Sequence, residues 1–126
     1  MVGLVVVSHS GRAAEGIREV AAEMADETSI EAVGGDPDGG IGTSAPAIRE
    51  ALDSLADEDG VVVLVDLGSA VMNAEIAIEE SDADAKIADA PVLEGAVNAA
   101  VAATSPKASM ESVVEAAEEA ADISKL

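Results

Sequence analysis

The chain of 126 residues contains no cysteine and no phenylalanine, tryptophan or tyrosine. Without cysteine there can be no disulfide bond, no thiolate nucleophile and no cysteine-ligated metal ion. The single histidine excludes a histidine-rich metal site, which leaves only Asp and Glu for a hard cation. We therefore expect neither a metal site nor a cofactor.

Long apolar runs and basic residues are also scarce. No run approaches the ~20 apolar residues that span a bilayer, and the N-terminus lacks the positive region of a secretion signal. With 26 acidic against 6 basic residues, the net charge of −20 repels nucleic acid and anionic membranes. The sequence predicts a cytoplasmic protein with no nucleic-acid partner and no membrane partner.

The acidic residues are spread along the whole chain, lysine is rare, and alanine and valine stand in place of bulkier apolar residues. This pattern is typical of a halophile's cytosolic protein, since at ~1 M salt the Debye length falls to ~3 Å and repulsion is muted. We expect marginal folding at low salt. The hydrophobic content of 49% nevertheless excludes a disordered acidic tail.

Short apolar runs alternate with helical patterns along the chain. The expected strands cover residues 2–7, 30–33, 61–65 and 85–89; the expected helices begin at residue 12 and at 43 or 44, and then cover about 70–80, 92–104 and 109–122. The first helix is expected to gather Ile17, Val20, Ala21 and Met24 on one apolar face. Together these elements predict an α/β fold, with an open, mostly parallel, four-stranded sheet and helices on both faces. We expect a single domain over residues 1–126.

Three segments that follow strands are expected to meet at one edge of the sheet, because open α/β sheets bind ligands outside the carboxyl ends of their strands. They are Ser8-His9-Ser10-Gly11, the glycine-rich loop 34–42, and Asp66-Leu67-Gly68-Ser69. A neutral imidazole is a good nucleophile near pH 7, so a histidine at this edge favours a chemical role over a structural one. Asp66 is the best-placed carboxylate to hold the ring N–H, although it can also be read as a helix cap or turn residue.

Helix starts supply the second sign of chemistry at this edge. The free N–H groups and dipole of a helix N-terminus favour an anion such as phosphate, and Ser10 with Gly11, Thr43 with Ser44, and Ser69 all lie at expected helix starts. Each alone is an ordinary helix cap, but three of them beside a histidine suggest phosphoryl handling. The position of Arg12 is equally consistent with a side chain that binds the phosphate and with one that lies on the surface.

No nucleotide-binding motif accompanies these features. The glycine pairs of loop 34–42 are not followed by the Gly-Lys-Ser/Thr of a phosphate-binding loop, and Asp36 and Asp38 do not have the spacing of a calcium loop. The sequence therefore predicts a chain that carries a phosphoryl group without binding ATP itself.

Several stretches resemble a known family. They are Ser8-His9-Ser10, Gly42-Thr43-Ser44, Asp66-Leu67-Gly68-Ser69-Ala70-Val71-Met72-Asn73-Ala74-Glu75 and Pro91-Val92-Leu93-Glu94-Gly95-Ala96. On these residues nearly the whole chain resembles the DhaM phosphotransfer subunits of dihydroxyacetone kinase. Their first domain is similar to the enzyme IIA (EIIA) domain of the mannose-type phosphotransferase system (PTS). The resemblance implies the same fold.

The resemblance also implies a mechanism. His9 would accept a phosphoryl group on Nε2 from the carrier HPr while Nδ1–H faces Asp66, and Thr43, Gly68 and Ser69 would form the rim of the site. The group would pass to ADP held on the partner subunit DhaL, and the ATP so formed would phosphorylate dihydroxyacetone on DhaK. The family commonly forms homodimers, which suggests a homodimer here. Some members continue into HPr-like and enzyme I-like domains; because the resemblance here covers only the EIIA-like domain, we expect this domain to need a separate phosphoryl donor.

Other functions fit the same residues. Within phosphotransfer, the alternative is an EIIA subunit that feeds a mannose-type sugar transporter. Outside it, the chain can be a non-catalytic anion-binding module that uses the same edge of the sheet, or a structural α/β domain with a buried histidine.

Overall fold

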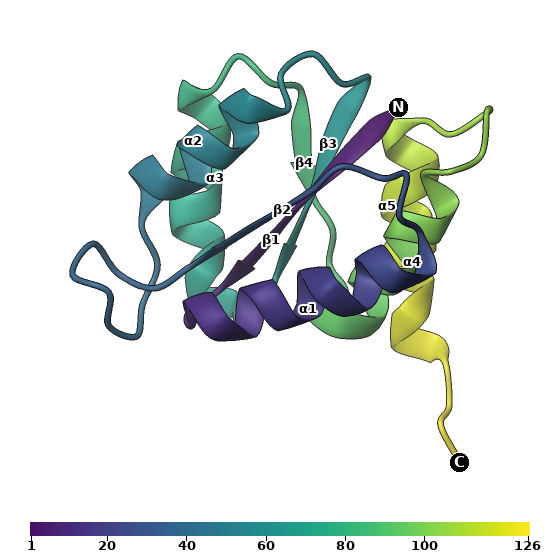
Figure 1. Cartoon of the computed structure of the whole chain (residues 1–126), viewed down its shortest axis with the longest axis horizontal. Coiled ribbons are helices and arrows are strands. Elements are labelled where there is room, and N and C mark those ends of the chain that lie inside the picture. The colour runs from purple at the N-terminus through teal and green to yellow at the C-terminus, as the bar shows by residue number, and fades with distance from the viewer.

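Strands and helices alternate along the chain in the computed structural model, which describes residues 1–126 (Figure 1). The elements are β1 Val2–Ser8, α1 Gly11–Met24, β2 Ile30–Gly34, α2 Ala45–Ser54, β3 Gly60–Val65, α3 Val71–Glu80, β4 Ala85–Ile87, α4 Val92–Ala102 and α5 Met110–Glu119, with short 3-10 turns at η1 Gly68–Ala70 and η2 Ala120–Asp122. The predicted α/β class is confirmed.

The four strands form one sheet in the order β2-β1-β3-β4, and every neighbouring pair is parallel. Leu4 in β1 lies opposite Ile30 in β2 and opposite Val62 in β3. The sequence left the position of the fourth strand open, and the structure places it at the edge of the sheet, beside β3.

Helices cover both faces of the sheet, as Figure 1 shows. On one face α1, α4 and α5 pack over Val2, Leu4 and Val6 of β1, and on the other α2 and α3 pack over Val5 and Val7. The strands are buried on both sides, which explains their unbroken apolar runs. None of the helices is both long enough and apolar enough to cross a membrane.

Some boundaries and one helix face differ from expectation. The fourth strand ends at Ile87 rather than at residue 89, and a 3-10 turn, η1, precedes α3. On α1, Val20 and Met24 are exposed, whereas Ala14 and Ala21 are fully buried. Ala21 of α1 shares one core with the buried Ala96, Ala99 and Ala100 of α4, so only a narrow stripe of α1 is covered and the larger side chains of Val20 and Met24 stay exposed.

The sheet order fixes where a site can form. The strand β1 lies in the middle, with β2 on one side and β3 on the other. The chain therefore changes direction across the sheet between β1 and β3, and in open α/β sheets ligands bind at such a switch point, beyond the carboxyl ends of the strands. His9 and Asp66 are the residues that follow these two strands.

Candidate functional site

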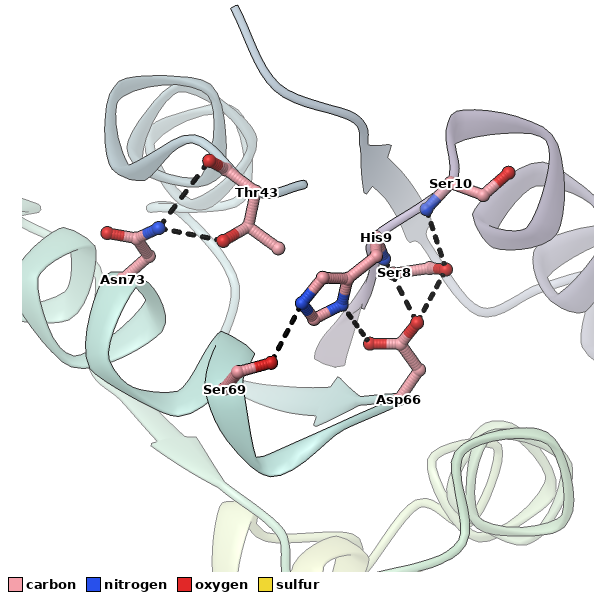
Figure 2. A network of polar contacts seen from close by, with 7 residues as sticks. All are labelled: Ser8, His9, Ser10, Thr43, Asp66, Ser69 and Asn73. Atoms are coloured by element: carbon pink, nitrogen blue, oxygen red, sulfur yellow. Dashed lines mark hydrogen bonds and ion pairs between the residues drawn. The ribbon is translucent and has the colours of Figure 1, made fainter. Parts of the chain in front are cut away.

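The pairing of β1 with β3 brings the two chain segments of the site together. Val7 lies opposite Val65, and the backbone N–H of Asp66 donates to the carbonyl oxygen of Val7 at 3.1 Å. Ser8 and His9 leave β1 at the point where Asp66 leaves β3. The Asp66 carboxylate therefore meets these two residues directly, as Figure 2 shows.

Each oxygen of the Asp66 carboxylate has defined partners. Oδ2 accepts hydrogen bonds from the Ser8 hydroxyl at 2.8 Å and from the His9 backbone N–H at 3.0 Å. Oδ1 lies 3.0 Å from Nδ1 of the His9 ring. The side chains of His9 and Asp66 are 21% and 20% exposed, so the pair is partly shielded while the ring still reaches solvent.

These contacts set the tautomer of a neutral His9 ring. An ionised carboxylate can only accept hydrogen bonds, so Nδ1 carries the proton and Nε2 carries the lone pair. Nε2 lies 2.9 Å from the Ser69 hydroxyl, which then donates to it (Figure 2). The ring is therefore held at both nitrogens. The nucleophilic nitrogen, Nε2, faces the Ser69 hydroxyl, which an incoming phosphoryl group could displace.

The environment of Asp66 keeps its carboxyl ionised. Partial burial by itself raises the pKa of Asp66, but hydrogen bonds from the His9 backbone, the His9 ring and the Ser8 hydroxyl outweigh it and lower the pKa below its ordinary value. The charged form is therefore the one that the ring meets at neutral pH.

Thr43 belongs to the loop between β2 and α2 and is held near the ring by α3. The amide nitrogen Nδ2 of Asn73 donates to the Thr43 hydroxyl at 2.7 Å, and the Gly42 N–H donates to the His9 carbonyl oxygen at 2.9 Å. Gly42 has a φ of 150°, in the region that favours glycine. The loop is thus fixed both to His9 and to α3 (Figure 2).

Ser10, Gly11 and Arg12 lie on another side of the site from Ser69. The Ser10 hydroxyl accepts from the Ala13 N–H at 3.3 Å and so caps α1; in Figure 2 it points away from the ring. All three residues border an open hollow of about 370 Å³, which is lined otherwise by Gly34, Gly35, Gly39, Gly40 and Ile41. A Cβ on Gly34 would meet the Ser10 carbonyl oxygen at about 2.5 Å, so glycine is required there for β2 to approach α1.

Two residues of the site have no role in the sequence analysis. Ser8, only 2% exposed, is named from the sequence only as part of the segment after the first expected strand and of a family motif, and Asn73 only within a motif. For Ser8 the sequence did offer a signal, because a polar residue stands at the end of an apolar strand. When β1 and β3 pair in parallel and in register, that residue lies beside Asp66. No local signal in the sequence links Asn73 to Thr43.

Gly68, which the sequence places at the rim of the site, lies exposed in η1 with open space around it. No three acidic or histidine side chains cluster closely enough to hold a metal ion.

A family model matches most of the chain. The model of EIIA-man, described as the PTS system fructose IIA component, matches residues 3–117. The matched region contains every residue of the site described above.

Curated relatives point in the same direction. The chain is 43% identical over 113 residues to the PEP-dependent dihydroxyacetone kinase phosphoryl donor subunit DhaM of Escherichia coli. The matched region covers 83% of this chain but only 24% of the E. coli protein. The chain is also 43% identical over 94 residues to a DhaM of Listeria innocua, covering 75% of each chain. This chain therefore spans about a quarter of the E. coli relative and most of the Listeria one.

Solved structures share the fold. A crystallised protein of unknown function superposes with a TM-score of 0.80 at 30% identity, covering 93% of this chain and 92% of the other. The phosphotransferase system component EIIA from Streptococcus agalactiae superposes with a TM-score of 0.65 at 21% identity, covering 93% and 89%. The second likeness supports the fold alone.

Proposed function

Because the chain belongs to the EIIA-man family, and to the DhaM subunits within it, we propose that it is a phosphocarrier subunit of a PEP-dependent dihydroxyacetone kinase, with His9 as the residue that is phosphorylated. The observation that carries this proposal is the His9 ring, partly exposed, with Nδ1 on Asp66 and Nε2 directed at Ser69. Residues 1–126 act as one phosphotransfer domain, in the cytoplasm, where phosphoenolpyruvate and ADP are found.

In the first step the lone pair of His9 Nε2 attacks the phosphorus of a phosphohistidine on a carrier protein, for which HPr is the candidate. The donor N–P bond breaks as the Nε2–P bond forms, and the donor imidazole leaves with the electron pair. The Nδ1 proton stays on the ring, where Asp66 offsets the positive charge that develops on it. The Ser69 hydroxyl, 2.9 Å from Nε2, turns from the nitrogen to an oxygen of the incoming phosphoryl group.

In the second step a terminal oxygen of ADP, held on DhaL, attacks the same phosphorus. The Nε2–P bond breaks, its electron pair returns to the ring, and ATP forms on the partner for the phosphorylation of dihydroxyacetone on DhaK. The backbone N–H groups of Gly68 and Ser69 and the Thr43 hydroxyl border the phosphoryl group. Ser10 and Gly11 supply the positive end of α1 on the other side.

The direct test is phosphorylation from phosphoenolpyruvate in the presence of enzyme I and HPr. We expect an acid-labile, base-stable phosphate on His9 and none on His9→Ala, whose circular dichroism should match the wild type because the ring is only partly buried. Asp66→Asn should bind HPr normally and transfer at least about 100-fold more slowly, since the carboxylate no longer orients and stabilises the ring. The proposal fails if the wild-type chain stays unlabelled while the same enzyme I and HPr phosphorylate another EIIA protein. The non-catalytic anion-binding module would then be the function that remains.

A second measurement separates the two phosphotransfer functions. The labelled chain is mixed either with DhaL–ADP or with a IIB protein of a mannose-type transporter. Formation of ATP supports the kinase subunit, whereas transfer to IIB alone would reassign the chain to sugar transport. We also propose a homodimer, which analytical ultracentrifugation across a range of protein concentrations tests independently of the chemistry.

A further inference from the structure

The outer surface of α1 and α4 carries large apolar side chains that no other element covers. On α1, Val20 and Met24 are 43% and 63% exposed, and on α4, Leu93 and Val101 are 39% and 48% exposed. The partly buried Val97 lies between the last two along α4. Residues four apart share a side of a helix, so each helix presents an apolar stripe. We refer to these five residues as the α1/α4 face.

The two stripes meet at a hollow. Val20 of α1 and Leu93 and Val97 of α4 line an open space of about 340 Å³ together with Ile123 of the C-terminal segment. Isolated exposed apolar residues are ordinary, but apolar residues that gather around a hollow are typical of an interaction site. The periodicity of α1 predicts Val20 and Met24 on a buried side, and the structure leaves both uncovered.

Carboxylates border this face. Glu19 and Glu23 are exposed beside Val20 and Met24, around a second shallow hollow. Neither forms an ion pair. An apolar centre with charged groups at its edge is the usual arrangement of a protein–protein interface, and here the charges at the edge are negative.

The chain's own C-terminal segment shows which chemistry the hollow accepts. Ile123 and Lys125 both line it, and the Lys125 ammonium lies 2.6 Å from the carboxylate of Glu94, a third acidic residue at the border. An apolar side chain and a cation two residues apart are thus already seated at one end of the face.

We propose that the α1/α4 face binds a cationic amphipathic helix of a partner protein. Its apolar side chains would lie in the hollow between the two stripes, and its lysines or arginines over Glu19, Glu23 and Glu94. Recognition of this kind uses anchors every three or four residues of the bound helix. A second copy of the chain fits less well, because it brings its own carboxylates to the interface and like charges there are costly.

This face is separate from the proposed phosphoryl site. Val20 lies nine residues after Gly11, about 14 Å along α1 from the end that adjoins His9. Nε2 of His9 faces Ser69, which precedes α3 on the other side of the sheet. A helix bound to the α1/α4 face therefore leaves the ring free, and the inference does not rest on the proposed function.

The probe is a synthetic amphipathic peptide of about 16 residues, just over four helical turns. It has leucine along one side, lysine elsewhere and one tryptophan, whose fluorescence reports binding because the chain has no aromatic residue. A scrambled peptide of the same composition has the same charge but no apolar side. Titrations in about 1 M KCl, where the Debye length is about 3 Å, prevent the net charge of the chain from binding both peptides alike.

We expect the wild-type chain to bind the amphipathic peptide at least about tenfold more tightly than the scrambled one. Leu93→Ser should remove most of this preference, as expected for a central apolar contact. The matched control is Ile76→Ser, at a position that is 40% exposed on α3, and it should keep the preference. Nitrogen-15 NMR shifts on binding should map to α1 and α4.

A second pair of variants tests the charges at the border. In about 0.1 M KCl, where screening is weaker, Glu23→Gln should weaken binding of the amphipathic peptide about threefold, the effect of one exposed ion pair. Glu79→Gln removes the same charge from an exposed position on α3 and should leave binding unchanged.

Other outcomes overturn the proposal in distinguishable ways. Equal binding of the two peptides, or an unchanged preference in Leu93→Ser, would remove the α1/α4 face from docking. Self-association that Leu93→Ser abolishes, without any preference between the peptides, would assign the face to a second copy of the chain. Peptide that blocks labelling of His9 by phospho-HPr would show that the two sites are not separate. A chain that binds the peptide but is never labelled would refute the proposed function and leave this inference standing.

Discussion

The hydroxyl of Ser8 donates to Oδ2 of Asp66 across 2.8 Å and at the same time accepts from the Ser10 backbone N–H at 3.1 Å. Because a backbone N–H can only donate, the hydrogen of the Ser8 hydroxyl is free to point at the carboxylate. The His9 backbone N–H binds the same oxygen. Oδ2 is thus occupied by two donors, and Oδ1 is left to face the imidazole. A buried serine determines how the acid meets the ring.

The variant Ser8→Ala should therefore weaken both the fold and the chemistry. Loss of a hydrogen bond to a charged acceptor is expected to lower the free energy of unfolding by about 1.5–3 kcal/mol. Phosphoryl transfer should slow by about tenfold, since Asp66 is freer to turn away from the ring. Nitrogen-15 NMR of the His9 ring should show a smaller fraction of the Nδ1–H tautomer, and single-turnover kinetics give the rate.

Ser109→Ala is the control for this variant. Ser109 caps α5, away from the site, and its removal should cost about 1 kcal/mol with no change in the tautomer. If Ser8→Ala loses stability yet keeps both the tautomer and the transfer rate, then Ser8 only supports the fold.

The lowered pKa of Asp66 makes its contribution to stability depend on pH. As the pH falls, the unfolded chain takes up this proton first, near the ordinary carboxyl pKa of about 3.9, and the folded chain only at lower pH. The stabilisation by Asp66 is therefore complete above about pH 5 and decreases as the pH falls through its folded pKa. We expect the difference in Tm between wild type and Asp66→Asn, measured in molar KCl, to shrink over this range. A difference independent of pH would contradict the assignment.

The core of the site was accessible from the sequence because simple rules governed it. Apolar runs marked β1 and β3, and parallel strands bring their carboxyl ends to one edge of the sheet, so His9, Asp66 and Ser69 could be expected together. Their mutual contacts match this expectation. Their roles in phosphoryl transfer stay predictions until the variants are measured.

The supporting contacts were beyond the sequence for physical reasons. The position of Ser8 beside Asp66 depends on strand register, and the contact of Asn73 with Thr43 depends on how a loop folds over α3. The exposure of Val20 and Met24 had a different cause. Periodicity indicates the apolar side of a helix, but the width of the covered stripe depends on the neighbour, here the closely packed alanines of α4.

Asn73 should act by holding the loop that carries Thr43. Without the 2.7 Å hydrogen bond from Asn73 Nδ2 to the Thr43 hydroxyl, the variant Asn73→Ala should lose about 1 kcal/mol of stability. The loop should open more often, which hydrogen exchange at the Gly42 amide would report as lower protection. Transfer should slow several-fold as the rim of the site loosens.

The matched control for this variant is Asn98→Ala. Asn98 on α4 donates to the Ala116 carbonyl oxygen of α5 at 3.2 Å and lies far along the chain from the loop. Its loss should cost similar stability but leave exchange at Gly42 unchanged. Equal protection at Gly42 in both variants would show that the loop is held by the Gly42–His9 hydrogen bond alone.

The net charge of −20 should make the fold dependent on salt. Few cations oppose this repulsion between acidic side chains. The ion pairs that they form involve exposed or partly exposed side chains, and such pairs add little stability. They include Arg18 with Glu15, Arg49 with Asp53 and Lys125 with Glu94. The Debye length falls from about 30 Å at 0.01 M to about 3 Å at 1 M salt, so Tm should rise from dilute buffer to molar KCl, most steeply at the lowest concentrations. The control is sucrose, which stabilises folded proteins because it is excluded from their surface but does not screen charges. A Tm that is unchanged by KCl, or that rises only as it does in sucrose, would show that charge repulsion does not limit this fold.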